Sequence, residues 1–172
     1  FDCATIALLD DRSDAMLSES GKKMRRLVQQ NPISHDEYGT VWHLRNGCCY
    51  DFSSNFHVKL PAGVAADLII RSTLNRSGVF LTSGLYDSGF NGGVCGMLRI
   101  SGGDFYLAPN TRIGQIKFVR SEDSGQLYAG GYNHAEGTHW TDPTTDTVKQ
   151  LERAHNITAD HQGVPAGRQS FI

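Results

Sequence analysis

Long apolar runs are absent from this sequence: no stretch approaches the roughly 20 consecutive apolar residues that a transmembrane helix requires. The basic, then apolar, then small-residue pattern of a secretory leader is missing as well. We therefore expect a cytoplasmic protein that has no membrane partner.

An excess of positive charge is also missing, since the formal net charge of the chain is −2. Domains that coat nucleic acid are usually basic, so this balance argues against a nucleic-acid partner. It does not exclude a nucleotide substrate, because a few well-placed arginines and lysines are enough to bind one triphosphate.

Cysteine is scarce, and its spacing is uninformative. The four cysteines are Cys3, Cys48, Cys49 and Cys95. No two of them have the C-x-x-C spacing of a zinc site, so we expect no metal held by protein ligands of this kind. The adjacent pair is poorly placed to form a disulfide with itself, and we expect all four to be reduced thiols.

The sequence does contain enough material for one globular domain. Its 172 residues allow one substantial core, and its 39% hydrophobic residues argue against a disordered chain. Nineteen glycines fit short strands joined by tight turns. We predict a single domain over residues 1–172, with an N-terminal helical segment (1–40), a β core that carries the motifs (41–120), and a lid and tail (121–172).

Helices are predicted only near the two ends of the chain. Apolar residues recur at roughly helical spacing between Ser13 and Gln30, and Asn31-Pro32 would end that helix. A second, shorter helix is predicted over Thr144 to Ala154. The first helix would carry a basic face, read as solvent-exposed with phosphate contact as the alternative, formed by Lys22, Lys23, Arg25 and Arg26.

Short β-prone runs separated by turn residues fill the middle of the chain. Strands this short at this spacing predict an all-β sandwich, jelly roll or barrel, and the missing strand–helix alternation argues against a Rossmann-like sheet. The predicted strands are Phe56 to Leu60, Val64 to Ile70, Val79 to Leu85, Val94 to Ile100, Phe105 to Leu107 and Ile113 to Val119.

Residues that suit phosphate chemistry follow one of these strands. Arg71, Ser72 and Thr73 supply a cation and two hydroxyls at the end of the run that closes at Ile70, and Arg76 adds a second cation. Phosphate oxygens accept charge-assisted and hydroxyl hydrogen bonds, so this corner is a candidate phosphate site. The alternative is an ordinary polar surface turn.

A candidate base lies in the glycine-rich turn that follows. Asp87 is flanked by Gly84, Gly89 and Gly92, and glycines let a backbone approach a ligand closely. A carboxylate in that setting can act as a general base on water, although an aspartate that caps a β-turn is the common alternative.

Two further residues have both a ligand-binding and a structural interpretation. Phe90 can stack on a sugar or base, or it can be a core aromatic. Gln115, between two isoleucines, can bind water or phosphate, or it can face solvent.

Taken in order, four segments resemble the successive motifs of trimeric dUTPases and dCTP deaminases. They are C-Y-D-F (49–52), R-S-T-L-N-R-S-G (71–78), G-L-Y-D-S-G-F-N-G (84–92) and R-I-G-Q-I (112–116). The resemblance covers about residues 49–119. It implies a distorted jelly roll, the β-clip of dUTPases, with the two predicted helices flanking it, assembled as a homotrimer with active sites at subunit interfaces.

The resemblance also implies roles for individual residues. Asp87 would activate the water that attacks the α-phosphorus of a deoxynucleoside triphosphate, and Phe90 would pack against the deoxyribose. Mg²⁺ would be held mainly by the substrate phosphates, with no metal site formed by the protein alone. The other expected substrate-binding residues are Arg71, Ser72, Thr73, Arg76, Gly92, Gln115 and, in the lid-like segment 128–137, Tyr132.

The choice between the two branches of this superfamily depends on one position. Arg76 and the segment 128–137 resemble the deaminase branch, but the glutamate that deaminases need on the next strand would fall at Met97. A thioether carries no transferable proton, so we favour hydrolysis. The match to dUTPases has gaps too: their upstream Asn would fall near Leu81, and Arg168 is the nearest candidate for their Arg-bearing fifth motif.

Three functions therefore stay open. The first is a pyrophosphatase that converts dUTP, or a modified pyrimidine deoxynucleotide, to the monophosphate and pyrophosphate. The second is a dCTP deaminase, with or without the hydrolase activity. The third is a catalytically inactive regulatory trimer that binds nucleotide.

Overall fold

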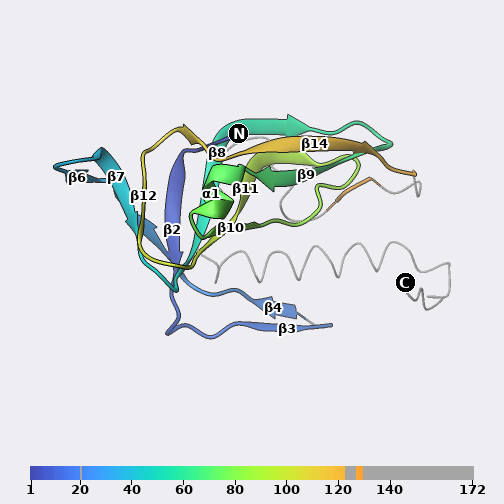
Figure 1. Ribbon diagram of the computed structural model, residues 1–172. Helices are drawn as coiled ribbons and strands as arrows, with labels where there is room; N and C mark the ends of the chain where they lie inside the picture. Colours follow the sequence, from blue (N-terminus) through green and yellow to red (C-terminus); the bar gives the residue numbers. More distant parts are fainter. Residues whose placement is uncertain (20, 123–126, 130–172) are drawn as a thin grey trace.

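The structure, a computed structural model, describes residues 1–19, 21–122 and 127–129. Its only helix within these residues is α1 (Ser72–Arg76), and the rest of the regular structure is β (Figure 1). The predicted all-β class is therefore confirmed. No helix among the described residues is long and apolar enough to cross a membrane.

A five-stranded antiparallel sheet forms the body of the molecule. The strand order is β10-β11-β8-β2-β5. β8 and β11 share the longest ladder, which a bulge between Gly93 and Cys95 interrupts. The strands are β2 (Thr5–Leu9), β5 (Leu27–Gln30), β8 (Cys49–Lys59), β10 (Val79–Thr82) and β11 (Asn91–Ile100).

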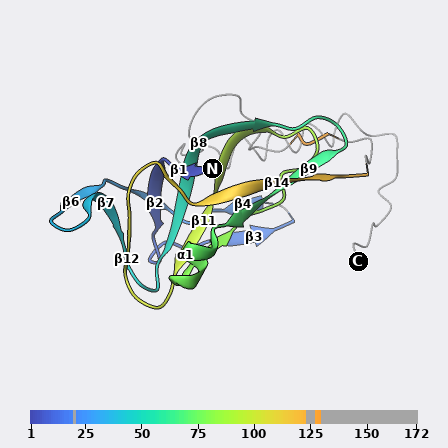
Figure 2. The same ribbon diagram turned by 45° about the horizontal axis from the view of Figure 1, so that its top comes forward.

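Four smaller sheets surround this body. Both views of the ribbon place β6, β7 and β12 at one end of the molecule and the β9–β14 pair at the other (Figures 1 and 2). Their strands are β1 (Asp2–Cys3) with β13 (Thr111–Arg112), β3 (Met16–Ser18) with β4 (Gly21–Lys23), β6 (Ile33–His35) with β7 (Gly39–Leu44) and β12 (Phe105–Leu107), and β9 (Val64–Ile70) with β14 (Gly114–Arg120).

One face of the large sheet forms the main core, because alternate residues of a strand point to opposite faces. Tyr50 and Phe52 of β8 are almost fully buried, as are Leu98 and Ile100 of β11. A second, smaller cluster unites the end of β8 with β9 and the turn before β11; it consists of Leu60, Ala66, Tyr86 and Phe90. This second cluster fixes the glycine-rich turn on the body.

Most predicted strands are confirmed. The runs Val64 to Ile70 and Phe105 to Leu107 coincide with β9 and β12, and the run Ile113 to Val119 is shifted by one residue in β14. The run Phe56 to Leu60 is the end of β8, which begins at Cys49. All four cysteines are free, as expected.

The predicted N-terminal helix from Ser13 to Gln30 is wrong, because the described residues of 1–40 form short strands joined by turns and irregular segments. The β3–β4 hairpin and β5 occupy that stretch. Its apolar residues do recur at helical spacing, but tertiary contacts override that weak preference. The second predicted helix, Thr144 to Ala154, lies outside the described residues.

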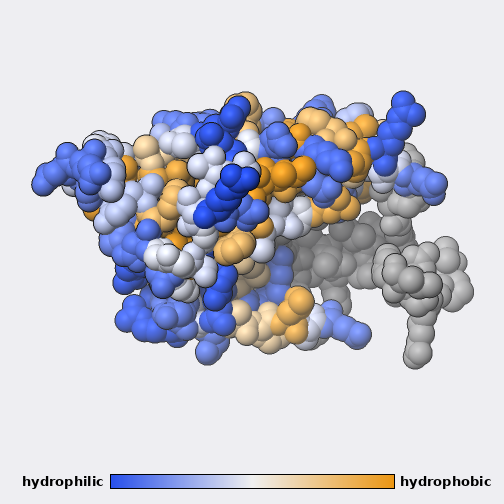
Figure 3. Space-filling view, in the orientation of Figure 1, coloured by the Kyte–Doolittle hydropathy of each residue, from blue (hydrophilic) through white to orange (hydrophobic). Residues whose placement is uncertain are grey.

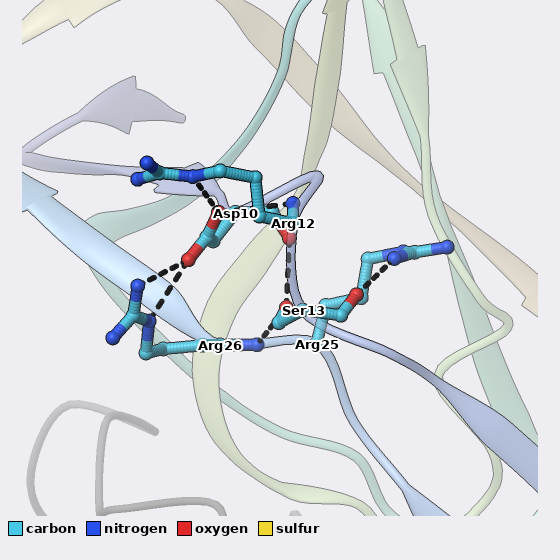
Figure 4. Close-up of polar contacts among 5 residues, drawn as sticks. All are labelled: Asp10, Arg12, Ser13, Arg25 and Arg26. Carbon is cyan, nitrogen blue, oxygen red and sulfur yellow. Dashed lines mark hydrogen bonds and ion pairs between the residues drawn. The ribbon is translucent and has the colours of Figure 1, made fainter.

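A buried carboxylate explains why the chain folds back here (Figure 4). The Asp10 side chain is only 5% exposed. It accepts a hydrogen bond from the Arg12 backbone N–H at 3.0 Å and another from Arg26 Nε at 3.0 Å, besides its salt bridge to Arg26. Ser13 Oγ donates to the Asp10 carbonyl and accepts from the Arg26 backbone N–H. The two ends of the hairpin are thus joined at its base, which a continuous helix would not allow.

Candidate functional site

The second and fourth motifs meet at the start of α1. Arg71 follows β9 in extended conformation, and its backbone N–H donates to the Ile113 carbonyl at 2.9 Å. Its Nη1 donates to the Arg112 carbonyl, also at 2.9 Å. Because β14 pairs with β9, Gln115 lies opposite Ile69, two residues before Arg71. The candidate phosphate residues and Gln115 therefore lie at the same end of this strand pair.

Close packing explains the glycine inside the fourth motif. A Cβ at Gly114 would lie 2.5 Å from the Ile69 carbonyl oxygen and would also meet the Phe1 ring. The Phe1 amino group donates to the Gly114 carbonyl at 2.9 Å. Only glycine fits between β9 and the first residue, so this close approach holds Gln115 next to the end of β9.

A shallow cavity of about 280 Å³ opens beside α1, lined by Ser72, Asn75, Arg76 and Phe80. Ser72, Thr73 and Arg76 are exposed, and the Phe80 side chain is 46% exposed. Figure 3 shows hydrophilic surface over α1 with hydrophobic surface beside it. The cavity thus combines a hydroxyl, an amide and a guanidinium with an open aromatic ring.

Positive charge gathers around this cavity without being neutralised. Arg76, the last residue of α1, lines the cavity, Arg71 comes directly before α1, and Arg99 lies opposite Phe80 in the β10–β11 ladder. None of the three forms a salt bridge with a carboxylate in the part of the chain that the structure describes. Arginines left without counter-ions in a chain of net charge −2 are available for an anionic ligand.

The turn that carries Asp87 is held from both sides. Tyr86 exchanges two backbone hydrogen bonds of 2.9 Å with Ala66, and the Tyr86 hydroxyl donates to the Cys95 carbonyl at 2.7 Å. The Phe90 backbone N–H closes the turn on the Asp87 carbonyl at 3.0 Å. The Asp87 side chain is exposed and forms no hydrogen bond or salt bridge with another described residue. A fixed backbone thus presents a carboxylate that is available to water.

Phe90 and Gly92 are structural in this conformation. The Phe90 ring is 4% exposed and packs edge-on against Tyr86 at 4.7 Å between ring centroids, with Tyr128 at 5.6 Å on another side. This is the core role that the sequence left open, and a contact with deoxyribose stays a prediction. Gly92 is buried in β11 opposite Val58.

The candidate base and the candidate phosphate residues are far apart within one chain. Tyr86 pairs with Ala66 near the start of β9, whereas Ser72 follows the end of β9. Six residues of extended chain separate Ala66 from Ser72, which corresponds to about 20 Å. One chain alone therefore does not bring Asp87 to the cavity at α1.

Tyr132, the lid residue expected to bind substrate, lies outside the described residues.

One polar residue in the first motif received no role from the sequence. The buried Oδ1 atom of Asp51 in β8 has no hydrogen-bond partner within the described residues. Burial raises the pKa of the Asp51 carboxyl to about 7. The sequence feature that could have identified this residue is a carboxylate between Tyr50 and Phe52, in a strand that is otherwise apolar at this point.

Few side chains among the described residues are placed to coordinate a metal ion. No three His, Cys, Asp or Glu side chains gather among the residues that the structure covers. Asp51 lies in β8 and Asp87 in the segment between β10 and β11, each as a single carboxylate. Mg²⁺ binds readily through one or two carboxylates together with substrate phosphates and water. This arrangement fits an ion that arrives with a triphosphate.

Comparisons with known proteins point to one superfamily. Residues 11–121 match the family model described as dCTP deaminase-like. Over 113 residues the chain is 32% identical to the "Probable deoxyuridine 5'-triphosphate nucleotidohydrolase" of Methanopyrus kandleri, covering 63% of this chain and 69% of that protein.

Solved structures give weaker matches. The 2'-deoxycytidine 5'-triphosphate deaminase from Agrobacterium tumefaciens has a TM-score of 0.49 at 16% identity, over 68% of this chain and 36% of that one. The EIAV dUTPase has a TM-score of 0.44 at 11% identity, over 80% of this chain and 96% of that one.

Proposed function

Because this chain belongs to the dUTPase and dCTP deaminase superfamily, we propose that it hydrolyses a pyrimidine deoxynucleoside triphosphate, dUTP or a modified relative, to the monophosphate and pyrophosphate. The observation that carries this proposal is the group of arginines around α1 that have no carboxylate partner among the described residues. A polyphosphate is the ligand that such a group suits best. The name of the Methanopyrus relative supports the same activity.

The phosphates bind at the start of α1. Arg71 and Arg76 supply the charge, and the hydroxyls of Ser72 and Thr73 supply neutral donors. Gln115 lies at the same end of the β9–β14 pair and donates through its amide. Mg²⁺ would be held mainly by the substrate phosphates and would supply positive charge that neutralises part of theirs.

Asp87 acts as the general base. Its carboxylate accepts a proton from water while the water oxygen attacks the α-phosphorus. The bond between the α-phosphorus and the bridging oxygen breaks, and pyrophosphate leaves with the electron pair. The fixed turn between Tyr86 and Phe90 keeps the carboxylate in place, so Phe90 and Gly92 contribute by positioning.

The active site forms between copies of the chain. Ala66, which pairs with Tyr86 next to Asp87, lies about 20 Å along β9 from Ser72 of the same chain, so we propose that a neighbouring copy in a homotrimer supplies Asp87. Tyr132 belongs to the proposed lid. We propose a cytoplasmic enzyme.

One observation favours the second candidate, a dCTP deaminase. Met97 offers no proton, but the Asp51 carboxyl lies directly opposite it in the neighbouring strand. A carboxyl with a pKa of about 7 can transfer protons near neutral pH. This candidate predicts ammonia release from dCTP.

A product assay tests these functions together. The protein is incubated with Mg²⁺ and each deoxynucleoside triphosphate in turn, and the products are separated by chromatography. Monophosphate plus pyrophosphate from a pyrimidine nucleotide is the expected result. A triphosphate with an altered base, together with ammonia, would replace hydrolysis by deamination, and binding without a product would indicate a regulatory trimer.

A further inference from the structure

Two hairpins project from different parts of the molecule, and the proposed hydrolysis uses neither of them. The β3–β4 hairpin lies at the bottom of Figure 1, and the β6–β7 hairpin lies at its left end. Among the described strands, β3 and β4 pair only with each other. An isolated two-stranded hairpin is marginally stable in water, so it gains stability from a surface on which it can pack.

One side of the β3–β4 hairpin presents apolar side chains to solvent. Leu17 lies directly opposite Lys22, so these two side chains share a face. Met24 comes two residues after Lys22 and therefore follows on the same side. Leu17 is 84% exposed and Met24 is 49% exposed, and Figure 3 shows hydrophobic surface on this hairpin. We call Leu17, Lys22 and Met24 the hairpin face.

The β6–β7 end of the molecule carries a group of aromatic rings. Tyr106 of β12 lies opposite His43 of β7, and the centroid of its ring is 4.8 Å from those of His43 and His35. Tyr38 is 49% exposed and stacks on His35 at 4.6 Å. We call these four rings the aromatic face. Because each ring is held by a neighbour, the face is a firm platform of the kind that anchors protein–protein contacts.

The two surfaces carry opposite charges. The hairpin face includes Lys22, whereas the turn between β6 and β7 contains Asp36 and Glu37, both exposed. Neither carboxylate forms a salt bridge with another residue that the structure describes. Complementary charges steer two surfaces together and fix their register. The hairpin face of one copy therefore suits the aromatic face of another copy.

Threefold symmetry requires contacts of this type. In a closed ring of three copies each copy contacts the next head to tail, so two different surfaces of the chain must be complementary. We propose that the hairpin face of one copy packs on the aromatic face of the next, with Lys22 beside Asp36 and Glu37. This contact rests on the proposed function, in which a neighbouring copy supplies Asp87. Methionine adds a favourable contact between its sulfur and the aromatic rings.

Charge reversal on either surface tests the contact. Lys22→Glu should raise the dissociation constant of the trimer about tenfold or more, because it turns an attraction into a repulsion. Asp36→Lys together with Glu37→Lys should act in the same direction. All three changes in one chain restore opposite charges and should return the dissociation constant close to that of the wild type. Sedimentation equilibrium over a range of protein concentrations measures these constants.

The hairpin offers a matched control on its other face. Lys23 lies opposite Met16 and points away from the hairpin face. Lys23→Glu makes the same change of charge one residue away, and it should leave the dissociation constant unchanged in about 0.15 M salt, which screens distant charges.

An uncharged variant tests the apolar part of the contact. Because Leu17 is exposed in the single chain, Leu17→Ser should leave the circular dichroism spectrum unchanged. It should nevertheless weaken assembly about tenfold, since a large apolar side chain is no longer buried between copies.

The outcomes separate this contact from the proposed function. Equal effects of Lys22→Glu and Lys23→Glu, or a combined charge reversal that does not restore assembly, would overturn the contact and leave hydrolysis standing. A wild type that stays monomeric would overturn both the contact and the shared active site, and turnover by that monomer would still establish hydrolysis. Turnover by Lys22→Glu that is lost on dilution and regained at high protein concentration would support both.

Discussion

Asp51 on β8 lies directly opposite Met97 on β11 in the antiparallel ladder. The position at which the sequence lacks a proton-transferring side chain thus has a carboxyl as its cross-strand neighbour. Pairs of this kind are in contact across a sheet face. Although Met97 cannot ionise, this part of the sheet face therefore still has an ionisable group in Asp51.

Replacement of the candidate base should stop turnover. We expect Asp87→Asn to lower kcat by a factor of about 10² to 10⁴, since general-base catalysis contributes about that much. Because the side chain is exposed, the fold and the oligomeric state should not change. Steady-state kinetics and light scattering check both points, and wild-type turnover in the variant would remove Asp87 from the mechanism.

Loss of a cation at α1 should act on binding. Arg76→Gln should weaken nucleotide affinity about 10- to 100-fold, because hydrogen bonds to charged groups contribute about 1.5–3 kcal/mol. Lys23→Gln removes the same charge from the β3–β4 hairpin and serves as the control. Calorimetric titration with α,β-imido-dUTP measures both, and equal effects of the two variants would contradict a specific phosphate site.

Asp51 should make stability depend on pH. In the folded state the Asp51 carboxyl keeps its proton up to about pH 7, whereas in the unfolded chain it loses the proton near pH 3.8. The free energy of unfolding should therefore fall as the pH rises from about 4 to about 7, by an amount of the order of 4 kcal/mol. Asp51→Asn should remove this dependence on pH. Urea unfolding at pH 5 and pH 8 measures the free energy of unfolding of the variant and of the wild type. An increase of equal size at both pH values would show that Asp51 is not the group responsible.

Asp10 should show the opposite dependence. Its hydrogen bonds from Arg26, and then from Arg12, lower the pKa of its carboxyl. Such a group stabilises the fold above the pKa of the unfolded state and loses its effect as the pH falls through the folded-state pKa. Asp10→Asn should thus lower the melting temperature at neutral pH and matter less in acid. Asp14→Asn, in an exposed ion pair with Lys23, is the control and should have little effect at either pH.

Replacing two glycines that have nearly the same φ by alanine should cost different amounts of stability. Gly47 and Gly78 have φ of +79° and +77°, but a Cβ meets nothing within 4 Å at Gly47 and collides with the Ser101 carbonyl at Gly78. Gly47→Ala should cost about 1–2 kcal/mol from the left-handed conformation alone. Gly78→Ala should cost several kcal/mol more, because the turn into β10 must move. Chemical denaturation measures the two values, and similar values would contradict the close approach.

Local sequence patterns were sufficient to predict most strands of the β core. β9 and β12 were predicted with their correct bounds because each is a β-prone run between turn residues. The N-terminal segment was different. Its side chains allow a helix, but the contact of Asp10 with Arg26, sixteen residues away, and the pairing of β5 with β2 hold it in β structure. A pattern search does not detect a partner at that distance.

By itself the sequence determined the all-β class and the order of four motifs, because strand periodicity, turn glycines and short polar segments are local properties. The tertiary structure decided which of those motifs meet. It joined Arg71 to Arg112 through the β9–β14 pair, left Asp87 at the far end of β9, and placed Asp51 opposite Met97. These relationships follow from strand register, which long-range pairing and core packing fix and no single segment encodes.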